Sequence, residues 1–155
     1  MLITTSKSPS PACRRIARAF FLAVPESALE FRGKRTLSAL ASKARKKRFA
    51  RICAIYQQKG MPSQIRFLET GERGWEWLSP HILITKITHA PAHKGSLSQS
   101  AGLKIAGSKA RALRLLLDQS GKPEEAQSEI ISSAGGLSVK LGAKKLLELG
   151  VKYEK

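Results

Sequence analysis

A short loop rich in hydroxyl groups is the first stretch of the sequence whose residue types could do chemistry. It follows the apolar segment 2–5 and precedes Pro11, which is a favourable first residue of a helix. Together with Thr5 at the end of that segment, its hydroxyl side chains are those of Ser6, Ser8 and Ser10, the last of which is a good helix N-cap. Because free backbone N–H groups and the positive end of a helix dipole face such a loop, we predict that it binds an anion.

Basic side chains gather in the same part of the chain. Residues 1–51 hold 13 Lys or Arg against 2 Glu, a net charge of +11 out of +17 for the whole sequence. An excess of this size favours a polyanionic partner, with nucleic acid first and an acidic membrane surface second. Solvated helix faces with a purely structural role are the alternative. The candidates for phosphate contact are Lys7, Arg14, Arg15, Arg18, Arg32, Lys34, Arg35, Lys43, Lys46, Lys47 and Arg48.

Other chemistry lacks the residues that it needs. No glycine-rich phosphate loop and no nucleophile elbow is present, and the only aspartate is Asp118. His89 and His93 have a spacing that binds zinc on a helix, but Pro91 lies between them and no cysteine or carboxylate nearby completes a site. We therefore predict no catalytic residue, no metal site and no cofactor.

The cysteines and the apolar runs indicate where the protein works. Cys13 and Cys53 stand alone, without a Cys-x-x-Cys pair, which fits a reducing compartment. No stretch approaches the roughly 20 apolar residues that span a bilayer, and the N-terminus does not read as a signal peptide. The sequence predicts a cytoplasmic protein with no membrane partner.

The elements that must position the loop and the basic side chains follow from hydrophobic spacing. The first half predicts a strand at 2–5, a helix from Pro11 to about Ala23, a short strand at 29–31 and a helix from Leu37 to about Lys47. A β-hairpin with a five- or six-residue loop is predicted over 51–69. In the tight turn that contains Gly33, we expect a positive φ or close backbone packing.

Two tryptophans follow the hairpin, in an extended stretch from Trp75 to Ile87 that is broken at Pro80. Trp75 and Trp77 are two residues apart, so they share one face of a strand. Such a pair is more typical of sheet packing than of base stacking, which stays open as the alternative.

The second half begins after a stretch of small and polar residues, 88–101, which we interpret as an exposed linker. A strand at 103–106 and helices at 108–119 and 123–134 are predicted, followed by strands at 137–141 and 145–153. At 155 residues with 42% hydrophobic side chains, the chain is long enough for one packed domain. We therefore expect one α/β domain, 1–155, with an N-terminal half of about 1–87 and a C-terminal half of about 102–155. Both halves mix strands with helices, which hints at internal duplication.

Two segments of the sequence resemble a known family. The opening, residues 2–10, is followed by a basic helix that ends near Pro25, as at the start of the Brix-domain family. Residues 31–34 (Phe-Arg-Gly-Lys), followed by a helix and a hairpin with Lys-Gly-Met-Pro at its turn, resemble the same family. The short chain is similar to the archaeal single-domain members of the Imp-four-like branch. The match covers residues 2–69, and residues 71–75 depart from the Gly-Pro-Thr segment of eukaryotic relatives.

The resemblance implies both a fold and a function. It implies two similar α/β halves that share a core and resemble the anticodon-binding domain of class II aminoacyl-tRNA synthetases. It also implies a non-catalytic, RNA-binding ribosome-biogenesis factor that binds ribosomal RNA or its precursor, with guide RNA and other assembly proteins as further candidate partners. Two alternatives stay open: a tRNA-binding module acting beside a synthetase, and an enzyme that binds a phosphorylated ligand at the hydroxyl loop.

Overall fold

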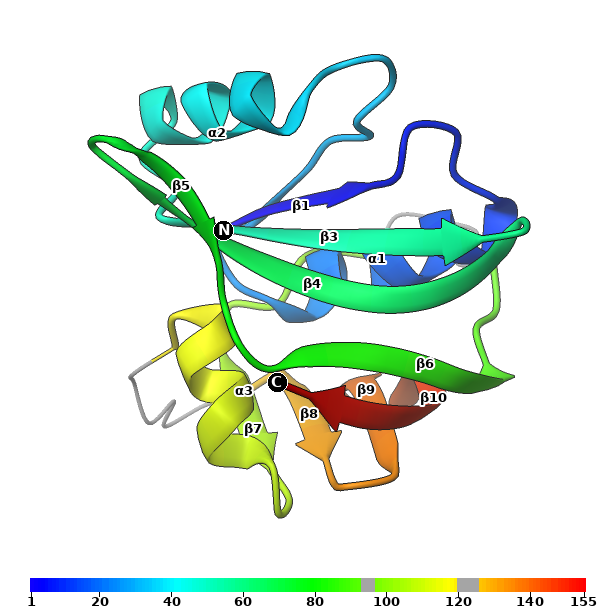
Figure 1. Cartoon of the computed structure of the whole chain (residues 1–155). Coiled ribbons are helices and arrows are strands. Elements are labelled where there is room, and N and C mark those ends of the chain that lie inside the picture. Colours follow the sequence, from blue (N-terminus) through cyan, green and yellow to red (C-terminus); the bar gives the residue numbers. More distant parts are fainter. Residues whose placement is uncertain (93–96, 120–125) are drawn as a thin grey trace.

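One ten-stranded sheet and three helices make up the fold in the computed structural model, which describes residues 1–92, 97–119 and 126–155 (Figure 1). The strands are β1 (Leu2–Thr5), β2 (Ala28–Leu29), β3 (Arg51–Gln58), β4 (Met61–Gly71), β5 (Gly74–Trp77), β6 (His81–His89), β7 (Leu103–Ala106), β8 (Ser128–Ser132), β9 (Gly136–Leu141) and β10 (Lys144–Glu154). The helices are α1 (Pro11–Ala23), α2 (Leu37–Lys46) and α3 (Ala110–Leu117). The predicted mixed α/β class is confirmed, with a sheet that is mostly antiparallel.

The strand pairing of the first half is repeated in the second half. β1 pairs parallel with β3, β3 antiparallel with β4, and β4 antiparallel with β6. In the same way β7 pairs parallel with β8, β8 antiparallel with β9, and β9 antiparallel with β10. An antiparallel pair of β6 and β10 joins the two sets into one sheet with the order β2-β1-β3-β4-β6-β10-β9-β8-β7, and β5 pairs with β4 off this path.

Helix α1 forms as its sequence predicts and lies at the centre of the main core. The Ser10 hydroxyl accepts the Cys13 backbone N–H, and Pro11 opens the first turn. Its buried side chains pack in one cluster with residues from both halves of the sheet. Leu22 is therefore fully buried, although its spacing places it on the same side of this helix as Arg15 and Arg18. The second half supplies the cover, since Ser100 donates its backbone N–H to the Leu22 carbonyl.

Helix α2 packs on the opposite face of the sheet from α1. Alternation along the strands separates the two faces, because Ile3 and Cys53 belong to the α1 core whereas Leu2 and Ile52 pack against α2. Leu40 on α2 is fully buried in this smaller cluster. The first half is therefore a sheet with one helix on each face, and loops connect the ends of its strands.

The hairpin predicted over 51–69 is confirmed, but its predicted five- or six-residue loop is wrong. The turn consists of Lys59 and Gly60 alone, with φ values of 50° and 79°. Gln58 pairs with Met61 directly across the turn. Positive φ at both central positions is typical of the two-residue type I′ turn, which matches the twist of the strands.

The helix predicted over 123–134 is wrong in its described part, where the structure has strand β8. Ile130 pairs with Ile105 of β7 and with Val139 of β9. The predictions that rest on Gly121, Pro123, Glu124 and Glu125, and on His93, lie outside the described residues.

The predicted linker is less exposed than its composition indicates. Strand β6 continues to His89, and Gln99 donates its side-chain amide to the carbonyl oxygens of Phe21 and Val24. Ser100 is only 3% exposed. The described end of this stretch therefore fastens the second half to the C-terminal end of α1.

Gly33 has a φ of +58°, which confirms the positive φ expected of its turn. No described atom lies within 4 Å of the position that a Cβ would take, so a substitution there is opposed by the backbone alone. We expect Gly33→Val to lower the free energy of unfolding by about 1–2 kcal/mol, because a β-branched residue is strongly disfavoured at positive φ. Urea denaturation measures this change. Gly33→Asn is the matched control and should cost less, and equal stability of the two variants would contradict a left-handed turn.

Candidate nucleic-acid interface

The hydroxyl loop and the turn around Gly33 lie at the same end of the sheet. β1 and β3 are parallel, so their carboxyl ends meet at one edge. Glu30 donates its backbone N–H to the Ile3 carbonyl, which places the following turn beside the end of β1. The Arg14 guanidinium lies 5.5 Å from the ring centroid of Phe31, so the start of α1 is also at this edge. We call this region the basic edge; it contains Lys7, Arg14, Arg32 and Lys34.

Gln57 organises the hydroxyl loop, a role that the sequence did not indicate. Its side-chain oxygen accepts the Ser10 N–H at 2.7 Å, and its amide nitrogen donates to the Ser8 carbonyl at 2.7 Å. The Ser10 hydroxyl accepts the Cys13 N–H, so two of the backbone donors expected to meet an anion are already engaged. An anion at this loop would therefore have to be held by other groups, such as the side chains of Ser8 and Lys7, both exposed. In the sequence, the only indication of this role is that Gln57 is a polar residue at the end of an apolar strand.

Thr5 and Ser6 sit deeper in the same loop. The Thr5 side chain is 1% exposed, and its hydroxyl donates to the Ser6 carbonyl at 3.2 Å. The Ser6 hydroxyl is buried and has no hydrogen-bond partner among the described residues. Of the four hydroxyl groups predicted to bind an anion, those of Thr5 and Ser10 thus form hydrogen bonds within the loop and the start of α1.

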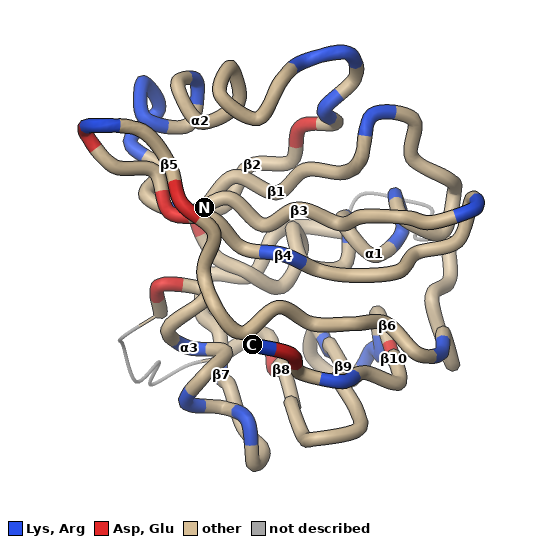
Figure 2. Tube along the Cα trace, in the orientation of Figure 1, with Lys and Arg blue, Asp and Glu red and all other residues tan. Residues whose placement is uncertain are grey.

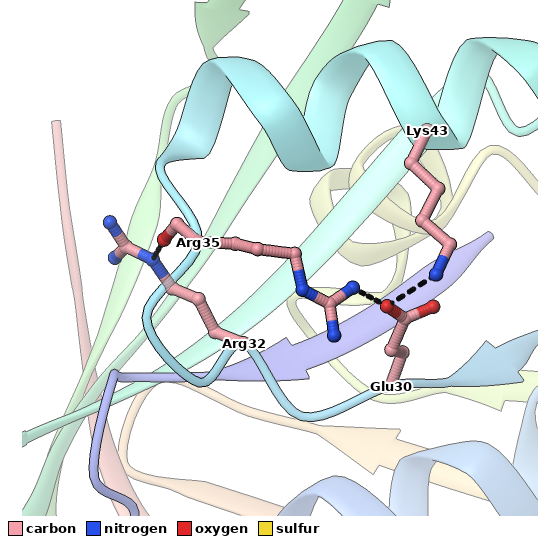
Figure 3. Close-up of polar contacts among 4 residues, drawn as sticks. All are labelled: Glu30, Arg32, Arg35 and Lys43. Atoms are coloured by element: carbon pink, nitrogen blue, oxygen red, sulfur yellow. Dashed lines mark hydrogen bonds and ion pairs between the residues drawn. The ribbon is translucent and has the colours of Figure 1, made fainter.

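The carboxylate of Glu30 compensates the charge of two of the side chains predicted to contact phosphate (Figure 3). Its carboxylate forms ion pairs with Arg35 and, at 2.7 Å, with the Nζ of Lys43. Arg32 donates its Nε–H to the Arg35 carbonyl at 2.8 Å, which closes the turn. The side chain of Glu30 is 18% exposed, so the pairs are only partly screened by solvent. Arg35 and Lys43 therefore fasten the turn to α2, and Arg32 and Lys34 are the cations of this turn without a described acidic partner.

The cations at the C-terminal end of α2 form a separate group. Lys46, Lys47 and Arg48 are exposed, and Figure 2 shows basic residues at both ends of this helix. Arg45 donates to the carbonyl oxygens of Gly71 and Glu72, so this end of α2 lies at the β4–β5 turn. That turn lies by the start of β3, whereas the basic edge lies at the end of β3. The structure thus does not bring the eleven predicted side chains into one cluster.

The remaining candidates lie on α1. Arg15 donates to the Ala90 carbonyl at 3.4 Å, just past the end of β6. Arg18 is half-buried, and its Nε has no hydrogen-bond partner among the described residues. These two side chains extend the positive charge from the basic edge toward the second half.

An aromatic cluster with an arginine lies on the α2 side of the sheet. Trp75 and Trp77 contact each other edge to face, with centroids 5.6 Å apart, which confirms that they share a face. Tyr56 contacts Trp77 in the same way at 6.2 Å, and the Arg66 guanidinium lies 4.0 Å from the Trp77 centroid. Burial raises the pKa of Tyr56, while the charges of Arg32 and Arg66 oppose that rise. Tyr56 therefore joins this cluster to the basic edge.

The described residues offer little to covalent or metal chemistry. Burial raises the pKa of the Cys13 and Cys53 thiols, which disfavours a thiolate at either position. No group of three or more His, Cys, Asp or Glu side chains in residues 1–92, 97–119 and 126–155 could hold a metal ion. In the same residues, no helix is long and apolar enough to cross a membrane.

Solved structures match nearly the whole chain, whereas no protein-family model and no curated protein sequence matches it. A probable ribosomal biogenesis protein from Aeropyrum pernix K1 superimposes with a TM-score of 0.75 at 19% identity, over 99% of this chain and 94% of that chain. Mil, an archaeal Imp4-like protein, superimposes with a TM-score of 0.67 at 19% identity, over 98% of this chain and 97% of that chain. The resemblance to the Imp-four-like branch, noted from residues 2–69, is confirmed at the level of the fold and extends over the second half.

Proposed function

We propose that the chain is an RNA-binding ribosome-biogenesis factor, which binds ribosomal RNA precursors and assists their processing or assembly without catalysing a reaction. The basic edge carries the proposal, because it gathers cations from two separate loops and a helix start on a fold shared with a probable ribosomal biogenesis protein and an archaeal Imp4-like protein. Its partner would be the phosphate backbone of ribosomal RNA.

Charge and geometry at the basic edge suit a phosphate backbone. Lys7, Arg14 and Lys34 are exposed and Arg32 is partly exposed, so they can approach successive phosphates without rearrangement of the core. Each Lys or Arg that neutralises a phosphate releases condensed counterions, which is the main source of affinity in sequence-independent binding. The net charge of +17 adds long-range attraction to the encounter.

An acidic membrane surface suits the structure less well than RNA does. Basic helices that lie on membranes need an apolar face to insert between the lipids. The apolar side chains of α2, Leu40, Ala41 and Ala44, are buried against the sheet. The cations of α2 therefore lack the exposed apolar face that such a surface requires.

Crosslinking in the protein's own cells, followed by sequencing of the bound RNA, tests the proposal. We expect reads that concentrate on ribosomal RNA precursors, and co-recovered guide RNA or assembly proteins would identify further partners. A variant with Lys7, Arg32 and Lys34 changed to Ala, expressed at the same level, is the matched control and should lose most of these reads. Enrichment of tRNA over ribosomal RNA would contradict the proposal. It would favour the module beside a synthetase instead, in line with the expected kinship of the halves to anticodon-binding domains.

A further inference from the structure

We propose that the sheet face around Arg66 and Trp77 is a stacking platform for unpaired bases of an RNA strand. The proposal rests on the proposed RNA-binding function and adds the kind of RNA that the protein selects, a strand with accessible bases. We call this surface the stacking face; it consists of Tyr56, Arg66, Trp75 and Trp77.

Strand register places these side chains on one face of the sheet. Arg66 pairs with Ala54, and Leu68 pairs with both Ile52 and Trp77. Ile52 and Leu68 pack against α2, so side chains at even steps along β3 and β4 share that face. Tyr56 and Arg66 continue the same face toward the basic edge, past the residues that α2 covers.

The rings are held in place before any ligand arrives. Trp77 makes edge-to-face contacts with Trp75 and with Tyr56, at interplanar angles of 78° and 63°. Trp75 donates its indole N–H to the Ser38 hydroxyl at 3.2 Å, which ties the pair to α2. Side chains that are already immobilised lose little conformational entropy when a base stacks on them.

Arg66 is an uncompensated cation at this position. Its Nε is buried without a hydrogen-bond partner among the described residues, and none of the described ion pairs includes it. Arg51, in contrast, is paired with Glu69 on the neighbouring strand. With its Cζ 4.0 Å from the Trp77 centroid, the planar guanidinium can offer its other face to a base and its N–H groups to a phosphate.

Charge complementarity favours RNA over a protein as the occupant. Across β4, β6 and β10 the row beside Tyr56 continues through Gln64, Leu83 and Lys152. Lys152 is already paired with Glu154, so Arg66 is the cation of this row and the stacking face that has no acidic partner among the described residues. Burial raises the pKa of the Tyr56 hydroxyl, and the charge of Arg32 is near enough to oppose this rise, so the stacking face adjoins the basic edge. A strand whose phosphates lie on the basic edge can therefore place its bases on the aromatic rings.

Tryptophan fluorescence tests the platform directly, because Trp75 and Trp77 are the only tryptophans in the chain. The full chain is titrated with an oligoadenylate of about eight nucleotides and with an abasic ribose-phosphate oligomer of the same length. We expect the oligoadenylate to quench the emission and to bind about 10-fold more tightly, since stacking on aromatic rings adds to the backbone contacts. The abasic oligomer should bind through its charge and leave the emission unchanged.

Two conservative variants localise the effect. Arg66→Lys keeps the charge but loses the planar group, so it should lose most of the preference for the oligoadenylate while binding of the abasic oligomer is unchanged. Arg73→Lys, in the exposed β4–β5 turn, is the matched control and should behave like the unchanged protein.

Each contrary outcome has a distinct meaning. Equal affinity for the two oligomers with no quenching of the unchanged protein would overturn the stacking face and leave the proposed function standing. If neither oligomer binds, both proposals are overturned. An Arg66→Lys variant that keeps the preference for bases but loses a co-purifying protein would assign the surface to a protein partner instead of RNA.

Discussion

Replacement of Gly107 by Ala is expected to destabilise the fold more than replacement of any other described glycine by Ala. A Cβ at this position would lie 2.2 Å from the carbonyl oxygen of Ser132 and 2.8 Å from its carbonyl carbon. The backbone φ of Gly107 is +96°, a conformation that side-chain-bearing residues rarely adopt. Because the clash is with backbone, it cannot be relieved by rotation of a side chain. We expect a loss of about 3 kcal/mol or more in the free energy of unfolding.

The close approach at Gly107 has a structural cause. Gly107 lies between β7 and α3. Two residues later, the backbone N–H of Lys109 donates to the same Ser132 carbonyl at 3.0 Å. A methyl group inserted there would push the start of α3 off the end of β8. Urea denaturation of the variant, followed by far-ultraviolet circular dichroism, measures the effect.

Gly142→Ala is the matched control for Gly107→Ala. Gly142 has a φ of +56°, and no described atom lies within 4 Å of the position of its Cβ. Only the backbone strain of about 1–2 kcal/mol should appear in this variant. Equal loss of stability in the two variants would show that the Gly107 loop relaxes freely and would contradict the tight packing on Ser132.

The helices α1 and α2 could be predicted because their stabilising interactions are local. Ser10 and Thr36 each cap a helix by accepting a backbone N–H three residues ahead, and such a pattern is visible in the chain order. Strand β8 could not be predicted in the same way. Its inward side chains include Ser128 and Ser132, which are buried, so its hydrophobic alternation is lost. The Ser128 hydroxyl donates to the Ala23 carbonyl at 2.6 Å, a partner far away in sequence.

The residue types of the candidate site could be predicted, but the ion pairs and hydrogen bonds that these residues form within the chain could not. The basic character of the first third is evident from composition, yet the two ion pairs of Glu30 depend on how α2 folds back over β2. The sequence does not indicate the roles of Gln57 and Arg66, because these roles arise from neighbours on other elements of the fold. Such cross-strand relations need a register, and the register follows from the tertiary fold.

Loss of three cations from the basic edge is expected to have the largest effect on RNA binding. Lys7, Arg32 and Lys34 are replaced together by Ala. Arg35 and Lys43 are spared because their ion pairs with Glu30 still hold the turn when the hydrogen bond from Arg32 to the Arg35 carbonyl is lost. For a single-stranded RNA, each lost phosphate contact should flatten the slope of log K against log salt by about 0.7, hence by about two units for three contacts. If the affinities converge near 1 M salt, the variant should bind about 100-fold more weakly at 0.1 M.

The matched control removes the same charge from the other half. Lys104, Arg111 and Lys155 are exposed residues of β7, α3 and the C-terminus. Their joint replacement by Ala lowers the net charge by the same three units but leaves the basic edge intact. Thermal unfolding of both triple variants first establishes that each is folded.

A pair of salt titrations with a single-stranded fragment of ribosomal RNA measures whether the basic edge binds the phosphate backbone. We expect a slope flatter by about two units for the Lys7, Arg32 and Lys34 variant and a nearly unchanged slope for the control. Equal flattening in both variants would show that the protein attracts RNA by diffuse charge alone, and it would contradict a site at the basic edge.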